Sequence, residues 1–111
     1  MEKTIRIEQS NGNNAVQVIL DYDKGGWNYY NGKIDPRGYW LIVRPVKIED
    51  RGDYSTISFG MFDGRRFFIE ETKRKSQKRI DTIFCNIDAE EVAKLYLAGE
   101  LERIREMLMN I

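Results

Sequence analysis

The spacing of apolar residues changes once along this chain, near residue 73, and this change restricts the folds that the chain can adopt. Residues 16–22 alternate apolar and polar side chains, which is the pattern of a strand with one buried face. Residues 80–87 instead carry isoleucine or phenylalanine at relative positions i, i+3, i+4 and i+7, the stripe of an amphipathic helix. A run of strands followed by a run of helices indicates an α+β fold.

Five strands are expected before that change. They cover roughly residues 3–9, 15–22, 39–48, 54–61 and 65–71. The polar residues 10–14 are a strong turn signal. Residues 25–38 are rich in glycine and read either as a long loop or as a glycine-broken hairpin, with turns at Asn31-Gly32 and at 35–38.

The segment 39–48 is the strongest strand in the sequence. Both of its faces are apolar, which indicates a central strand, and we expect Tyr39 and one tryptophan to belong to the core. Pro45 has no N–H to donate to a sheet ladder. We therefore expect this strand to pair on both sides at first and to lose one partner by Pro45.

The register of the next two strands depends on the turn that joins them. A two-residue Asp-Gly turn would place Arg66 on the same face as apolar residues of the preceding strand. A three-residue loop with Gly64 in the left-handed conformation gives a clean apolar face instead. That second, favoured register pairs Met61 with Arg65, Phe59 with Phe67, and Ile57 with Ile69.

Helix boundaries follow from capping residues. Ser76 is a candidate N-cap for the first helix, which could also begin nearer Thr72. Asp88 precedes a second helix with capping-box spacing, and Gly99 is a natural stop for it. A third apolar stripe covers residues 101–111.

Together these elements predict one α+β domain over residues 1–111. About five antiparallel strands (roughly 3–71) form a curved, meander-like sheet. Two to three C-terminal helices (roughly 73–110) pack on one face of it.

The side chains present exclude much chemistry. The chain has no histidine, which removes the commonest general base and the commonest transition-metal ligand. No GxxxxGK[ST] phosphate-binding loop occurs. We therefore expect no catalytic residue, no metal and no cofactor. An enzyme based on carboxylates such as Asp21 and Asp23 is kept as the third alternative.

The sequence also indicates a compartment. Residues 1–6 are charged and lack the apolar core of a secretory signal, and no apolar run reaches membrane-spanning length. The single cysteine, Cys85, has no internal partner for a disulfide, and its apolar neighbours predict that it is buried. We expect a cytoplasmic protein with no membrane partner.

Aromatic and basic residues give the main functional hypothesis. The net charge is zero, but residues 65–80 carry seven basic and two acidic side chains, whereas residues 81–111 carry three and seven. Aromatic rings stack on exposed bases, and clustered cations bind phosphates. We predict a non-enzymatic domain that binds nucleic acid, preferentially single-stranded DNA or RNA. Its candidate binding residues are Trp27, Tyr29, Tyr30, Lys33, Arg37, Arg66, Phe68, Lys73, Arg74, Lys75, Lys78 and Arg79.

The alternative is a module that binds another protein or a second copy of itself. In that case the exposed aromatic rings and the helix at 101–111 would meet the partner, with acidic and basic segments complementary between the chains.

One stretch of the chain carries a resemblance. Residues 28–33 (NYYNGK), 36–41 (PRGYWL) and 43–46 (VRPV) resemble a set of small uncharacterised bacterial proteins, often found on plasmids or other mobile elements. The resemblance covers residues 24–84 at most and implies no activity. In the order of its elements only, the chain is similar to the PC4-type and Pur-type single-strand-binding domains, which implies single-strand binding by analogy of fold.

Overall fold

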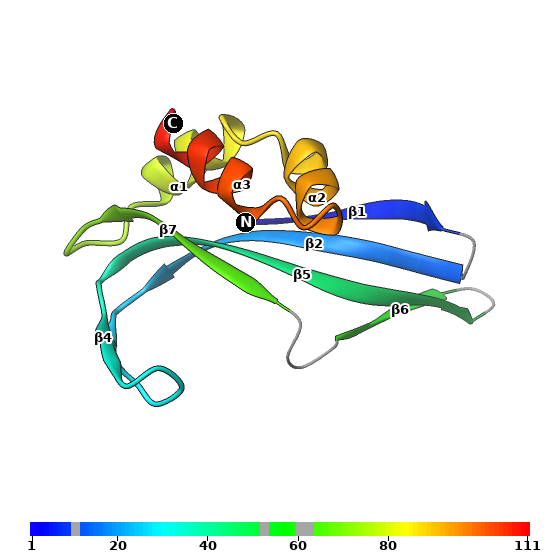
Figure 1. Cartoon of the computed structure of the whole chain (residues 1–111), viewed down its shortest axis with the longest axis horizontal. Helices are drawn as coiled ribbons and strands as arrows, with labels where there is room; N and C mark the ends of the chain where they lie inside the picture. The colour runs from blue at the N-terminus through cyan, green and yellow to red at the C-terminus, as the bar shows by residue number, and fades with distance from the viewer. Residues whose placement is uncertain (10–11, 52–53, 60–63) are drawn as a thin grey trace.

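The computed structural model describes residues 1–9, 12–51, 54–59 and 64–111. A layer of three helices covers one face of an antiparallel sheet, and a small hairpin bends away from the other face at one end (Figure 1). The molecule is elongated, with extents of 44 × 30 × 29 Å. The expected α+β fold is confirmed.

The elements follow the order predicted from the sequence, with two short strands added between residues 25 and 38. The strands are β1 (Glu2–Gln9), β2 (Gly12–Asp23), β3 (Gly26–Asn28), β4 (Lys33–Asp35), β5 (Gly38–Arg51), β6 (Tyr54–Phe59) and β7 (Arg65–Glu71). The helices are α1 (Gln77–Cys85), α2 (Ala89–Leu97) and α3 (Leu101–Met109). Of the turn expected at residues 10–14, residues 10 and 11 lie outside the described residues, and β2 already includes 12–14.

The main sheet is built around β5. One edge of β5 pairs with β2, which in turn pairs with β1. The other edge pairs with β7 over residues 38–43 and with β6 over residues 46–51. All of these pairs are antiparallel, so five strands form a single curved sheet (Figure 1).

The expected hairpin between β6 and β7 is wrong. Phe59 pairs with Val46, and Arg65 pairs with Val43, both of which belong to β5. Met61, the other end of the predicted register, lies outside the described residues. The physical reason is the length of β5, which at 14 residues is long enough to pair with both strands along one edge.

Pro45 marks the junction between these two pairings. Arg44 and Pro45 have partners in β2 but none in the described parts of β6 or β7. The expected loss of a partner at Pro45 is therefore found, but pairing resumes at Val46, so β5 extends to Arg51 rather than ending near residue 48.

The core lies between the sheet and the helices. Val18, Leu41 and Val43 are fully buried and share a cluster with Val92 of α2 and Ile104 of α3. A second cluster lies under α1 and contains Leu20, Tyr39, Ile80 and Ile83. Tyr39 is 1% exposed, which confirms its expected core position.

The helix boundaries confirm the capping argument. Oγ of Ser76 accepts a hydrogen bond from the Arg79 amide, so the first helix starts there and not at Thr72. Oδ1 of Asp88 accepts from the Glu91 amide, and Gly99 has a positive φ of 73° after α2. The third helix ends at Met109, two residues before the expected end.

Two expectations about burial are wrong. Cys85 is exposed, because it is the last residue of α1 and falls outside the apolar stripe that faces the sheet. Gln17 is a polar position of the alternating stretch 16–22 and is therefore expected on the solvated face of that strand, but it is 3% exposed. Its side-chain oxygen accepts a hydrogen bond from Nε of Arg44 on the neighbouring strand β5, which compensates the cost of burying the amide.

Candidate nucleic-acid interface

Among the described residues, the hairpin formed by β3 and β4 carries three of the exposed aromatic side chains, Trp27, Tyr29 and Tyr30. Trp27 pairs with Ile34 across it. The hairpin leaves the ends of β2 and β5 and bends away from the helix layer (Figure 1). Gly25 makes the bend possible, because its φ is +75° and a Cβ there would lie 2.7 Å from the Asp35 carbonyl oxygen.

The tip of the hairpin is held by side-chain hydrogen bonds. Oδ1 of Asn28 accepts from the Tyr30 amide (2.9 Å), and Oδ1 of Asn31 accepts from the Lys33 amide (3.0 Å). The Gly32 amide donates to the Asn28 carbonyl (2.9 Å). These local bonds organise the turn itself.

The rings therefore project from an ordered turn. Tyr29 is 89% exposed and Tyr30 is 95% exposed, and Trp27 is 56% exposed with an edge-to-face contact to Tyr29 at 6.4 Å between ring centroids. Burial in a core does not account for these three rings, unlike Tyr39.

Arg66 of β7 ties the hairpin to the sheet. Its Nη1 donates to Oδ2 of Asp35 in the hairpin (3.1 Å), and its Nη2 donates to Oδ2 of Asp23 at the end of β2 (3.2 Å). The guanidinium also lies over the Trp40 ring, 4.3 Å from the centroid, and Trp40 contacts Phe68 edge-to-face at 5.1 Å. The positive charge of Arg66 is thus already compensated within the molecule.

A pocket of about 270 Å³ lies between the hairpin and Arg66. It is lined by Asp23, Gly25, Gly26, Trp27, Asn28, Tyr29, Tyr30, Asp35 and Arg66. Its charged residues at neutral pH are one arginine and two aspartates, so the pocket itself has a net charge of −1. It suits a flat, uncharged group against the rings better than a phosphate.

Apart from Arg66, the cations at this end of the molecule lie beside the hairpin and do not line the pocket. The loop between β7 and α1 carries Lys73, Arg74 and Lys75, which are exposed and make no ion pair with the described residues. The loop is joined to the base of the hairpin, because the Thr72 amide donates to the Arg37 carbonyl (3.0 Å). Nε of Arg37 in turn donates to the Lys24 carbonyl (3.0 Å).

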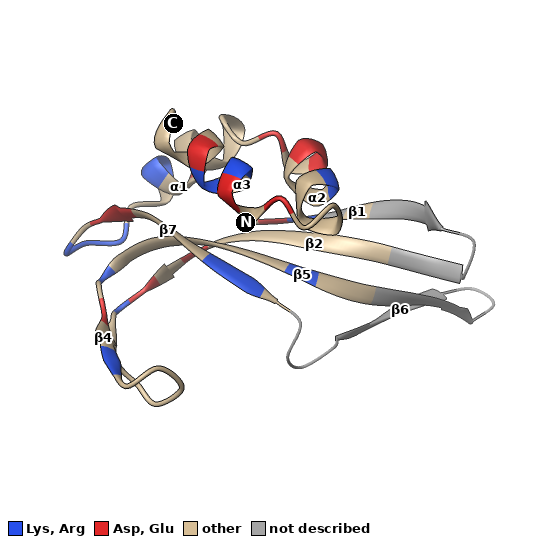
Figure 2. Ribbon diagram, viewed as in Figure 1, with Lys and Arg blue, Asp and Glu red and all other residues tan. Residues whose placement is uncertain are grey.

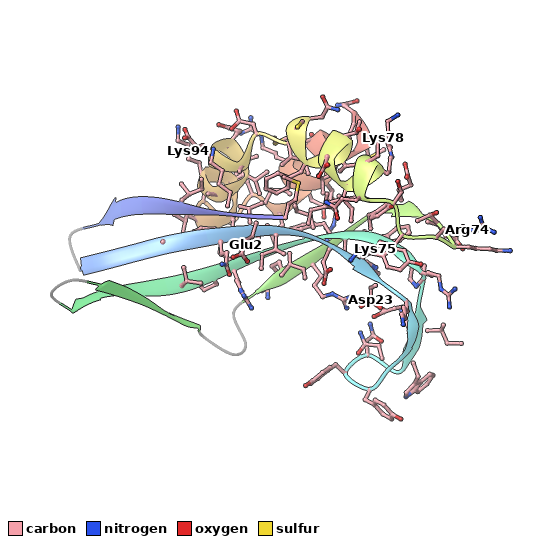
Figure 3. All side chains as sticks on the ribbon, turned by 180° about the vertical axis from the view of Figure 1, so that it is seen from behind. Glu2, Asp23, Arg74, Lys75, Lys78 and Lys94 are labelled. Carbon is pink, nitrogen blue, oxygen red and sulfur yellow. The ribbon has the colours of Figure 1, made fainter. Side chains whose placement is uncertain are left out.

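The figures place these cations at the same end of the molecule as the hairpin. Figure 2 shows lysine and arginine on both the loop and the hairpin. Figure 3 shows Arg74 projecting outward beyond the sheet, whereas Lys78 lies on the side of the helix layer.

Arg79 has a different environment. Its Nε and Nη2 donate to the two carboxylate oxygens of Glu70 at 3.0 and 2.6 Å. These hydrogen bonds, with the attraction between the two charges, hold the pKa of Glu70 below its ordinary value of 4.5 and raise the pKa of Arg79. Arg79 therefore links β7 to α1.

The predicted residues thus divide into three groups. Trp27, Tyr29, Tyr30, Lys33, Arg37, Lys73, Arg74 and Lys75 gather at one end of the molecule. Arg66 and Phe68 lie on the sheet face that the helices leave open, and Lys78 and Arg79 belong to α1. Two residues that organise this end of the molecule were not predicted: Asp35, which accepts a hydrogen bond from Arg66, and Asn28, which accepts one from the Tyr30 amide. The available signal was their position within a glycine-rich, aromatic segment.

Comparison with protein-family models, with curated proteins and with solved structures gave no match to this chain. In the described part of the chain, no group of three or more His, Cys, Asp or Glu residues is arranged to hold a metal ion. Among the same residues, no helix has both the length and the apolar character needed to span a membrane.

Proposed function

We propose that this protein is a non-enzymatic, cytoplasmic domain that binds single-stranded nucleic acid at the hairpin end of the molecule. One observation carries the proposal: three rings, Trp27, Tyr29 and Tyr30, project from an ordered hairpin. The base of this hairpin is hydrogen-bonded to a basic loop whose cations form no ion pair with the described residues. Bases stack on the rings, and phosphates contact Lys33, Arg37, Lys73, Arg74 and Lys75.

The same geometry favours single strands over duplex. Bases in a duplex are already stacked on one another, so an aromatic platform gains contact only with bases that are free of the stack. Phe68, which is 40% exposed on the open face of the sheet, offers a further apolar surface that a bound nucleic-acid strand can contact. Arg66 and Arg79 position the surrounding elements rather than binding phosphate, because carboxylates already neutralise them.

The proposal is tested by titrating mixed single-stranded oligonucleotides while recording tryptophan fluorescence at low salt. We expect quenching of Trp27 and an affinity that falls as salt rises, because phosphate contacts release counterions. Replacing Tyr29 or Tyr30 by Ser should weaken binding by about 5- to 150-fold for each base that loses its stacking partner. Both side chains are exposed, so stability should change by no more than about 0.5 kcal/mol.

A matched pair of charge variants tests the basic loop. Arg74→Gln should lower the steepness of the salt dependence by about 0.7 in the slope of log K against log salt. Lys94→Gln removes one exposed cation from α2, away from the hairpin (Figure 3), and should leave the slope unchanged. An unchanged tryptophan signal in all titrations would refute the proposal.

A protein-interaction module is the second candidate, favoured by Ile34. This aliphatic side chain is 75% exposed and lies across the hairpin from Trp27. Ile34 adds exposed apolar area but has no aromatic ring on which a base could stack. Its neighbours on the hairpin are Trp and Tyr, the residue types that contribute most to the binding energy of many protein interfaces. Failure of oligonucleotides to quench the fluorescence at low salt would favour this candidate.

A further inference from the structure

The polar side chains of the pocket between the hairpin and Arg66 offer mainly hydrogen-bond acceptors. Ionised Asp23 and Asp35 are acceptors only, with about four acceptor positions each. Asp23 accepts from Nη2 of Arg66 (3.2 Å) and from the Gly25 amide (2.7 Å). Asp35 accepts from Nη1 of Arg66 (3.1 Å) and from Nδ2 of Asn28 (3.2 Å). About half of these acceptor positions therefore receive no hydrogen bond from the described residues.

The vacancy is clearest at Asp35. Both of its donors bind Oδ2, and Oδ1 accepts no hydrogen bond from the described residues. The side chain is only 16% exposed, so its access to water is limited. A carboxylate oxygen that lacks a donor in such a place costs free energy. A ligand that enters the pocket with its own N–H groups removes this cost.

The aromatic rings set the shape of that ligand. Trp27 and Tyr29 both line the pocket, and their rings meet at 85°. A planar group that lies flat on one ring therefore presents its edge to the other. The volume of about 270 Å³ is enough for a single base. The pocket thus suits one planar group whose edge carries hydrogen-bond donors.

The bases differ in the donors that they present to a carboxylate. Guanine has two adjacent donors, N1–H and the N2 amino group, with no acceptor between them. Adenine and cytosine have a ring nitrogen acceptor beside their amino group, and uracil and thymine have a carbonyl oxygen on each side of their one N–H. An acceptor placed against a carboxylate stays unpaired, which lowers affinity. We infer that the pocket binds one unpaired guanine, whose N1–H and N2–H groups donate to Asp23 and Asp35.

The choice of base rests on the proposed binding of single strands. In a duplex both guanine donors are paired with cytosine, so a pocket that reads them can read guanine only in a single strand. Lys33 and Arg37, beside the pocket, then contact the phosphates that flank this guanine. The same cations disfavour a free organic cation, the other kind of ligand that rings and carboxylates bind.

Ligand substitutions test the inference on the unaltered protein. The full chain is titrated at low salt with thymine strands of about eight nucleotides, either unsubstituted or with one central guanine or hypoxanthine. The guanine strand should bind about 5- to 150-fold more tightly than the all-thymine strand. Hypoxanthine keeps N1–H but lacks the N2 amino group, so its strand should bind at least about fivefold more weakly than the guanine strand.

A matched pair of variants tests the carboxylates. Asp23 lies where β2 leads into the hairpin (Figure 3), and Asp23→Asn replaces one acceptor oxygen by an amino group. The ratio of guanine to thymine affinity should fall at least about fivefold. Asp21→Asn is the control, because Asp21 is exposed on the same strand and does not line the pocket. Both variants remove one negative charge, and circular dichroism checks that both keep the fold.

The outcomes separate the choice of base from single-strand binding itself. Equal affinity for the guanine, hypoxanthine and thymine strands overturns the guanine pocket and leaves single-strand binding in place. No binding of any strand overturns both. A guanine preference that Asp23→Asn and Asp21→Asn reduce equally also overturns the guanine pocket, because the base is then read elsewhere.

Discussion

Gly38 sits where β5, β7 and the base of the hairpin meet. A Cβ on this residue would lie 2.0 Å from the Glu70 carbonyl oxygen and 2.9 Å from the Glu71 Cα. All of these atoms belong to main chain, which cannot rotate away as a side chain can. The sequence marks Gly38 as a turn residue, whereas the structure shows that it permits the close approach of β7.

We expect Gly38→Ala to destabilise the protein by about 3 kcal/mol, because the added methyl group forces the two strands apart. The matched control is Gly64→Ala, where the nearest atom is Cβ of Arg44 at 3.3 Å, a contact that a shift of a few tenths of an ångström relieves. Urea unfolding measures both. Equal, small effects for the two variants would contradict the steric argument.

At the scale of elements, features that depend on neighbouring residues were predicted correctly from the sequence. The strand pairing, which depends on contacts between distant segments, was not. The caps at Ser76 and Asp88 and the stop at Gly99 were predicted, because these residues act on the backbone within a few positions of themselves. The pairing of β6 and β7 was mispredicted, because a strand pairs with whichever edge is available in the folded sheet. Turn residues alone could not reveal that edge.

The cap at Asp88 provides a prediction for α2. Asp88→Ala removes the acceptor for the Glu91 amide and should cost about 1 kcal/mol in the free energy of unfolding. Asp88→Asn keeps a side-chain oxygen at the same position and should cost clearly less. Chemical denaturation distinguishes the two, and an alanine variant as stable as the asparagine variant would show that the cap contributes little.

At the scale of the whole molecule, the Glu70–Arg79 pair joins the sheet to the helix layer. The pKa of Glu70 is lowered in the folded state, so the pair stabilises the fold at pH values above 4.5. This contribution is lost as the pH falls from there through the lowered pKa, because the carboxylate becomes protonated in the folded state as well. The effect is modest, since the side chains are 39% and 37% exposed.

Glu70→Gln should therefore lower the melting temperature at pH 7, and the difference from the wild type should shrink below pH 4.5. Glu71→Gln is the control, because Glu71 has no ion pair with the described residues. Thermal unfolding followed by circular dichroism from pH 7 to about pH 3 measures both. A Glu70→Gln difference that stays constant with pH would contradict the role of the ion pair.

The candidate site was only partly predictable. The sequence identified Trp27, Tyr29 and Tyr30 as rings that a core does not require, and their exposure agrees with that interpretation. It also grouped Arg66 with the phosphate-binding cations. In the folded molecule Arg66 contacts Asp23, which is 43 positions away in the chain, and Asp35, which is 31 positions away, so its charge is paired within the protein.

The sequence by itself determined the α+β class, the order of the main elements, the capping residues of α1 and α2, and the absence of histidine chemistry. These follow from side-chain periodicity, from capping within a few residues, and from composition. Only the tertiary structure decided that β6 and β7 share one edge of β5, that Arg66 is neutralised, and that the basic loop adjoins the aromatic hairpin. The reason is physical: each of these depends on contacts between distant segments, which exist only once the sheet has formed.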